Sequence, residues 1–155
     1  METWENSAGN KLKNMASVAS DILSFDESYL GYQRDRIART IRHNGPNEEI
    51  FYSLHELGCE AMRALKETDQ WNYEEMLKLL VRKQHDYGHE NILAFGIIGV
   101  GIRACDKVAR YFNLKDQPQA AQNEPFIDCM MDMVGYAVIG SMLKDNTFTL
   151  KLGCV

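Results

Sequence analysis

The stretch FIDCMMDMVGYAVIGSML, from Phe126 to Leu143, decides the fold class of this chain. Its only charged residues are Asp128 and Asp132, and its apolar side chains would point in nearly every direction around a helix axis. A helix of this kind is usually buried on most of its sides. The sequence therefore predicts a central helix that carries two carboxylates into an apolar environment.

The rest of the chain is also patterned for helices. The three prolines, Pro46, Pro118 and Pro125, fall where helical patterns begin or stop. We predict a frayed start to about residue 14, followed by helices at residues 15–24, 28–43, 47–67, 72–86, 95–113 and 125–144. Only the tail from Thr147 to Leu152 is ambiguous between strand and coil.

These elements predict an all-α fold, a helical bundle with a core of about four helices. The Asn44-Gly45-Pro46 break separates an N-terminal helical arm, residues 1–45, from a core domain at residues 46–146. Residues 147–155 form a tail. We expect the arm to pack on the core.

Composition limits the functions that the chain can have. With 155 residues and 45% hydrophobic side chains, it is long enough for one buried core. A net charge of -5 argues against binding nucleic acid or an anionic membrane through overall charge. We find no signal peptide and expect no membrane-spanning helix, so a cytoplasmic location is predicted.

The cysteines do not suggest a structural framework. The four residues, Cys59, Cys105, Cys129 and Cys154, are scattered without a CxxC pair or a Cys/His cluster. Neither a zinc site nor a set of disulfides is therefore indicated. Reduced thiols in a cytosolic protein are the simplest interpretation.

A spacing of four residues places Glu124, Asp128 and Asp132 along one stripe of the last helix. Like charges in an apolar interior need a counter-charge, because burial and mutual repulsion both raise their pKa values. A divalent cation would supply it, and oxygen ligands suit Mg²⁺ or Mn²⁺. The alternative is that the aspartates line a solvent-facing seam or pair with arginines.

A second acidic pair, Glu56 and Glu60, shares one face of the predicted helix at residues 47–67. By itself this is an ordinary polar helix face. If it meets the acidic stripe of the last helix, four carboxylates from two helices would surround one or two ions, as in metal sites of bundle cores.

The segment GIRACDKVARYF combines charge with an apolar stripe. The stripe consists of Ile98, Ile102, Cys105, Ala109 and Phe112. The charged residues beside it are Arg103, Asp106, Lys107 and Arg110. Three cationic side chains on one side of the helix could bind phosphate, and each arginine supplies paired N–H donors. A solvated face with an internal Arg/Asp pair is the alternative.

The segment KQHDYGHEN ends one helix and begins a turn, where Gly88 suits a C-terminal cap. Asp86, Tyr87 and Asn91 lie at this turn, where side chains can reach a ligand. Tyr87 can stack on a base and Asn91 can hydrogen-bond its edge. Turn chemistry alone also accounts for these residue types.

Three motifs in this order, KQHDYGHEN, FGIIGVGIRACDKVARYFNL and NEPFIDCMMDMVGYAVIG, resemble the nucleotide modification associated domain, type 1. That helical family is frequent in bacterial viruses and is related to the MazG-like all-alpha nucleotide pyrophosphohydrolases. The resemblance covers about residues 47–144. The HELGCEAM segment is similar to the first acidic helix of the MazG-like group. That group favours Glu-x-x-Glu and Glu-x-x-Asp, whereas the acids of this chain are four residues apart.

The resemblance implies a metal-dependent pyrophosphohydrolase that cleaves a (deoxy)nucleoside triphosphate to a monophosphate and pyrophosphate. The implied Mg²⁺ (or Mn²⁺) ligands are Glu56, Glu60, Glu124, Asp128 and Asp132. Catalytic stabilisation of the phosphoryl oxygens is implied for Arg103, Lys107 and Arg110. Nucleotide binding is implied for Asp86, Tyr87 and Asn91. A homo-oligomer, either dimer or tetramer, and a phage or bacterial origin follow from the same resemblance.

Two other classes of function stay open on the sequence. The altered carboxylate spacing is compatible with a non-catalytic protein that binds or sequesters a nucleotide. The third class is an interaction protein whose helical surface binds a partner while the carboxylates are structural.

Overall fold

The computed structural model describes residues 1–19, 24–117 and 123–153, except for the side chains of Asn123 and Glu124. The helices in these ranges are α1 (Trp4–Val18), α2 (Glu27–Arg42), α3 (Asn47–Glu67), α4 (Tyr73–Tyr87), α5 (Glu90–Leu93), α6 (Gly96–Leu114) and α7 (Asn123–Lys144). No strand occurs in the described part of the chain, including the tail up to residue 153. The prediction of an all-α fold is therefore confirmed.

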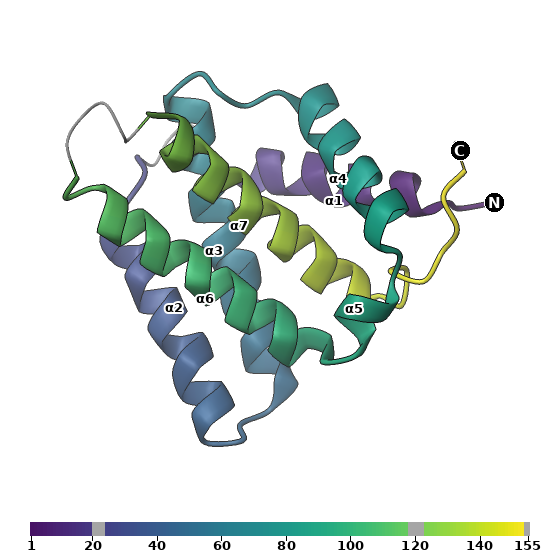
Figure 1. The fold of residues 1–155 in the computed structure, drawn as a ribbon, viewed down its shortest axis with the longest axis horizontal. Helices are drawn as coiled ribbons and strands as arrows, with labels where there is room; N and C mark the ends of the chain where they lie inside the picture. The colour runs from purple at the N-terminus through teal and green to yellow at the C-terminus, as the bar shows by residue number, and fades with distance from the viewer. Residues whose placement is uncertain (20–23, 118–122, 154–155) are drawn as a thin grey trace.

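Helix α7 is the centre of the molecule. It packs most extensively against α3 and α6, while α2 lies against both of those helices (Figure 1). On the other flank, α1 packs against α4, α3 and α7. Side chains on several sides of α7 are fully buried, among them Met130, Met133, Val138 and Met142. The bundle core consists of α2, α3, α6 and α7. The prediction of about four core helices is therefore correct in number, but α2, which the prediction places in the arm, takes the place expected for α4.

The composition of α7 bears on the expectation that the chain has no segment apolar enough to span a membrane. In the described residues, the segment Pro125–Lys144 is long and apolar enough to cross a membrane by those two criteria alone. The central helix of a packed bundle meets the same criteria, because it too is surrounded by apolar side chains. Its packing between α3 and α6 is sufficient to account for its composition.

The predicted frayed start is wrong, because helix α1 already begins at Trp4. The backbone N–H of Asn6 donates to Thr3 Oγ1 at 3.2 Å, and Thr3 N–H donates to Asn6 Oδ1 at 3.1 Å. This reciprocal pair is a capping box that satisfies two backbone donors at the helix start. The buried face of α1 consists of Trp4, Ala8, Leu12 and Met15. Polar residues between these positions obscure the pattern in the sequence.

The N-terminal arm and the tail belong to the same core as the rest of the chain. Leu12 of α1, Ile37 of α2 and Phe148 of the tail are all buried in one hydrophobic cluster. The backbone N–H of Trp4 donates to the carbonyl of Lys151 at 2.9 Å, and the Trp4 ring packs edge-on against Phe148. Figure 1 accordingly shows the two chain ends on the same side of the molecule.

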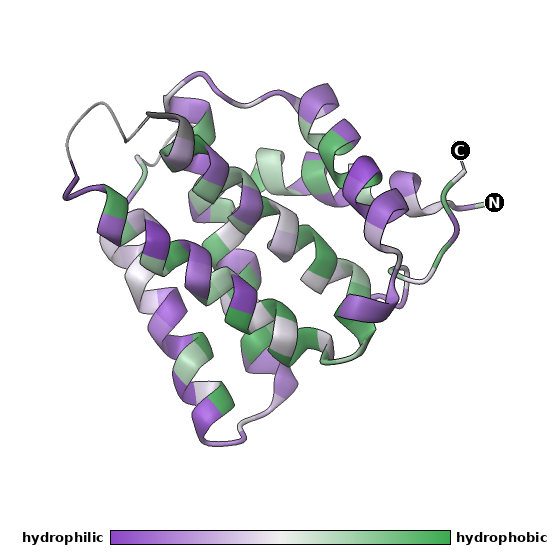
Figure 2. Ribbon diagram, viewed as in Figure 1, coloured by the Kyte–Doolittle hydropathy of each residue, from purple (hydrophilic) through white to green (hydrophobic). Residues whose placement is uncertain are grey.

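The remaining predicted helices agree with the structure to within two residues at each end. The short helix α5 is an addition, and α6 is oriented differently from the predicted stripe. Its buried face consists of Ile97, Val100, Gly101, Ala104, Val108 and Tyr111. Ile98 and Ile102 are instead 42% and 48% exposed. Together with exposed Leu93 and Phe95 they leave an apolar surface around the turn from α5 to α6, which Figure 2 shows as hydrophobic.

Candidate functional site

A pocket of about 500 Å³ opens between α4, α6 and α7. Its polar lining residues are Lys83, Gln84, Tyr87, Asn91, Arg103, Asp106, Lys107, Asp132 and Tyr136. Apolar side chains of α4 and α7, together with Ile92 of α5 and Trp4 of α1, complete the wall. A pocket of this volume, with an apolar wall and a few converging polar groups, is typical of small-molecule sites.

Asp132 is the centre of the charged part of the pocket. Its Oδ2 lies 3.0 Å from Lys107 Nζ of α6, and its Oδ1 lies 3.3 Å from Lys83 Nζ of α4. The carboxylate side chain is only 18% exposed. The counter-charge that an acid in an apolar helix requires is therefore supplied by two lysines. Arg103 lines the same pocket and adds a third cation.

Two opposing effects act on the lysine nearest to Asp132. Partial burial lowers the pKa of Lys107, whereas the hydrogen bond and the charge of Asp132 raise it. The second effect prevails, and the pKa lies above 10.5. Lys107 therefore carries its positive charge at neutral pH, next to a pocket that an anion can enter.

The turn after α4 brings Tyr87 and Asn91 to the pocket. Gly88 ends the helix with φ +67° and ψ -157°, and its N–H donates to the carbonyl of Gln84 at 2.8 Å. This backbone region is essentially restricted to glycine. The Gln84 amide is also 2.8 Å from His89 Nδ1, which ties the end of α4 to the start of α5.

The structure brings together a part of the predicted site. Tyr87, Asn91, Arg103, Lys107 and Asp132 line one pocket although they come from three separate motifs. The other members whose side chains the structure describes do not line it. Asp128 and Arg110 are exposed, and Asp86 is exposed beside His85. The side chain of Glu124 lies outside the described residues.

The predicted four-carboxylate metal cage is not formed. Glu56 accepts a hydrogen bond from the Tyr29 hydroxyl at 2.7 Å. Glu60 is buried, accepts from the Asp26 N–H at 2.9 Å and forms an ion pair with Arg63 at 3.0 Å. Both acids therefore face the start of α2, whereas Asp132 faces α4 and α6. Each acidic pair lies on one face of its own helix, but the two faces do not point to a common site.

Lys83, Tyr136 and Trp4 are among the pocket residues that the sequence analysis did not assign to a site. Lys83 lies four residues before Tyr87, on the same side of α4, and Tyr136 lies four residues after Asp132. These spacings are signals that the sequence offered. Trp4 offered none, because only folding brings α1 to the pocket. Its indole N–H is buried and has no hydrogen-bond acceptor among the described residues.

The structure is that of an all-helical protein with a pocket lined by both positively and negatively charged side chains. No family model matches the chain, and comparisons with curated proteins and with solved structures gave no match either. The geometry of the pocket is therefore the basis for a proposed function.

Proposed function

We propose that this pocket binds a nucleoside phosphate. The proposal is based on the presence of two kinds of side chain in one pocket. Cationic side chains can bind phosphate, and an aromatic ring together with an amide can bind a nucleobase. Lys83, Arg103 and Lys107 represent the first kind, and Tyr87 and Asn91 the second. The volume of about 500 Å³ is in the range of ligand pockets for molecules of this size.

The ion pairs of Asp132 suggest how a phosphate could bind: the two lysines would exchange the Asp132 carboxylate for the phosphate. The ammonium groups of Lys83 and Lys107 lie 3.3 Å and 3.0 Å from the oxygens of the carboxylate. A phosphate group that enters the pocket would take over these ammonium donors, because charge-assisted hydrogen bonds to phosphate are strong. Arg103 would add a planar guanidinium, whose forked N–H donors can bind two phosphate oxygens at once.

The nucleobase end of the pocket is assigned to the turn after α4. The Tyr87 ring is 70% exposed in the free protein, and stacking on a base would cover it. Asn91 can donate and accept hydrogen bonds at the edge of a base. A dimer or tetramer is part of the proposal, and the exposed Leu93, Phe95, Ile98 and Ile102 are the apolar side chains available for it.

Calorimetric titration with a panel of nucleoside and deoxynucleoside triphosphates tests the binding proposal. We expect Arg103→Met and Lys107→Met each to weaken binding at least about tenfold, because a lost charge-assisted hydrogen bond costs about 1.5–3 kcal/mol. Arg110→Met is the matched control, since Arg110 lies on the same helix but outside the pocket lining. Equal losses in all three variants, or no binding by the wild type, would contradict the proposal.

Pyrophosphohydrolysis is the second candidate, favoured by the two carboxylates that line the same pocket as the cations. Mg²⁺ is commonly held by one or two carboxylates together with substrate phosphates, and Asp106 and Asp132 fit that donor set. Such an ion would neutralise the phosphates and activate water. In this reaction Arg103 and Lys107 would stabilise negative charge on the phosphoryl oxygens.

Chromatography of nucleotides incubated with protein and Mg²⁺ separates the two candidates. We expect Asp132→Asn to abolish release of pyrophosphate while circular dichroism shows an intact fold. Asp128→Asn is the control, because Asp128 is exposed on the same helix and does not line the pocket. If the wild type binds nucleotides but releases no pyrophosphate, the protein is a nucleotide-binding or sequestering protein and the hydrolase candidate fails.

A further inference from the structure

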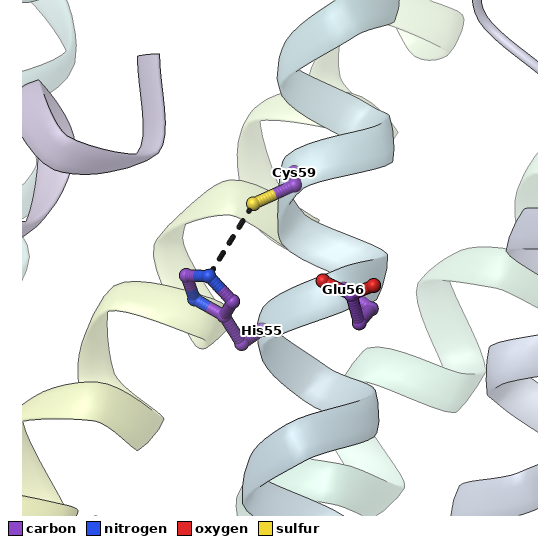
Figure 3. Close-up of side chains that lie close together, drawn as sticks. All are labelled: His55, Glu56 and Cys59. Atoms are coloured by element: carbon purple, nitrogen blue, oxygen red, sulfur yellow. Dashed lines mark hydrogen bonds between the residues drawn. The ribbon is translucent and has the colours of Figure 1, made fainter. Parts of the chain in front are cut away.

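A second group of ligand atoms lies on α3, away from the pocket. The side chains of His55, Glu56 and Cys59 place one nitrogen, one oxygen and one sulfur within 4.8 Å of one another. Figure 3 shows the imidazole and the thiol facing each other across one helical turn, with the Glu56 carboxylate nearby on the same helix. Among the described residues this is the one group of three such ligands.

The separation of the first two atoms is suited to a metal ion. His55 Nε2 and Cys59 Sγ are 3.6 Å apart. In a tetrahedral zinc site, Zn–N of about 2.0 Å and Zn–S of about 2.3 Å place the nitrogen and the sulfur roughly 3.5 Å apart. The spacing of four residues along a helix produces this distance without any change in the backbone.

The third ligand is already held in position by a neighbouring helix. Tyr29 of α2 donates its hydroxyl hydrogen bond to Glu56 Oε1 at 2.7 Å. This contact engages one carboxylate oxygen, Oε1, and the second oxygen of the same carboxylate could bind the ion. Hydrogen bonds of this kind, from a second residue to a metal-binding carboxylate, orient the ligand and raise metal affinity.

The surroundings do not suit the main alternative, a Cys/His pair that acts as a nucleophile. Burial, followed by the charge of Glu56, raises the pKa of the Cys59 thiol to about 11. Without a metal the thiol is therefore protonated at neutral pH, and a thiol is a poor nucleophile compared with a thiolate. A bound metal ion would displace this proton, since a coordinating thiol is deprotonated.

We propose that His55, Glu56 and Cys59 form a binding site for a thiophilic divalent cation, with Zn²⁺ as the best match. The mixed nitrogen, sulfur and oxygen donor set suits zinc and disfavours magnesium, which takes oxygen ligands. The three protein ligands come from positions 55, 56 and 59, within about one turn of α3, and the fourth tetrahedral position would be left for water. This site is independent of the nucleotide pocket, and its test does not depend on nucleotide binding.

Cobalt(II) titration of the full chain tests the site, after chelator treatment and in a metal-free reductant. Cobalt in a tetrahedral site with a thiolate ligand absorbs through a sulfur-to-metal charge-transfer band and intense visible bands. We expect both in the wild type at one ion per chain, and expect added Zn²⁺ to abolish them. Cys59→Ser should remove the charge-transfer band, and His55→Gln and Glu56→Gln should each weaken cobalt binding at least about tenfold.

Two further variants test whether the cobalt spectrum comes from this site. Cys105→Ser is the matched control, because burial also raises the pKa of the Cys105 thiol to about 11 but Cys105 lies on α6. Its spectrum should equal that of the wild type. Tyr29→Phe keeps the ring and removes the hydroxyl, and should weaken binding by roughly tenfold. Absence of the charge-transfer band in the folded wild type, its persistence in Cys59→Ser, or unchanged affinity in His55→Gln would overturn the proposal.

Discussion

Asp132 lies in the most apolar helix of the chain, yet its charge is balanced by two lysines from different helices. Lys83 and Lys107 are 51% and 28% exposed, so the three charges lie at the wall of an open pocket. An ion pair at such a position gives little stability, because water competes for it. Under the proposed function, a phosphate group would replace Asp132 as the partner of these two lysines.

Glu27 at the start of α2 gives a pH-dependent prediction. Hydrogen bonds from Lys115 and from the buried Tyr111 hydroxyl lower the pKa of its carboxyl below 4.5. A lowered pKa in the folded state means that the ionised form stabilises the protein above the unfolded value. This contribution is lost as the pH falls through the folded pKa.

We therefore expect Glu27→Gln to lower the free energy of unfolding at pH 7 by about 0.5 kcal/mol, a small effect because the carboxylate is partly exposed. At a pH well below 4.5 the difference from the wild type should shrink. Urea unfolding at both pH values measures it. A difference that grows in acid would contradict the prediction.

The helices α3 and α7 approach closely because Gly58 has no side chain. A Cβ atom added at Gly58 would lie 2.3 Å from the Cβ of Ala137, and also close to the sulfur of Met15. The Ala137 Cβ is fixed by its own backbone, so the two helices would have to move apart. This contact therefore determines the position of α7, and with it the positions of Asp132 and Tyr136.

We expect Gly58→Ala to destabilise the protein by about 1–3 kcal/mol, the usual effect of overpacking a core. Gly31→Ala is a matched control, because the added Cβ would be 3.5 Å from Phe112, an ordinary contact. It should be neutral or stabilising by up to about 1 kcal/mol through higher helix propensity. Denaturant midpoints of the two variants provide the comparison. Equal stability of both would show that α3 and α7 are not packed as described.

The molecule as a whole is predicted to unfold in one transition. Helix α1, the core helices and the tail share a single hydrophobic cluster. An arm at residues 1–45 that folded separately would not share it. In a Trp71→Phe background, where Trp4 is the one remaining tryptophan, fluorescence reports on α1 and far-ultraviolet circular dichroism reports on all helices. The two signals should therefore give coincident unfolding curves.

Leu12→Ala extends this test to a single buried side chain. Leu12 is fully buried in the shared cluster, so its truncation should destabilise the protein by about 2–5 kcal/mol. Both signals should shift together. If only the fluorescence transition moved, α1 would be an independent unit, and the single-core description would be incorrect.

The sequence by itself determined the helical class and most helix boundaries, because apolar periodicity and the positions of proline are local properties. It also proposed Tyr87, Asn91, Arg103, Lys107 and Asp132 as candidate site residues, and these five line one pocket. Only the tertiary structure decided which of the candidate residues lie close to one another. The rotation of each helix about its axis and the choice of neighbour depend on contacts between distant segments. For this reason Asp132 faces two lysines, whereas Glu56 faces Tyr29 and lies beside His55 and Cys59.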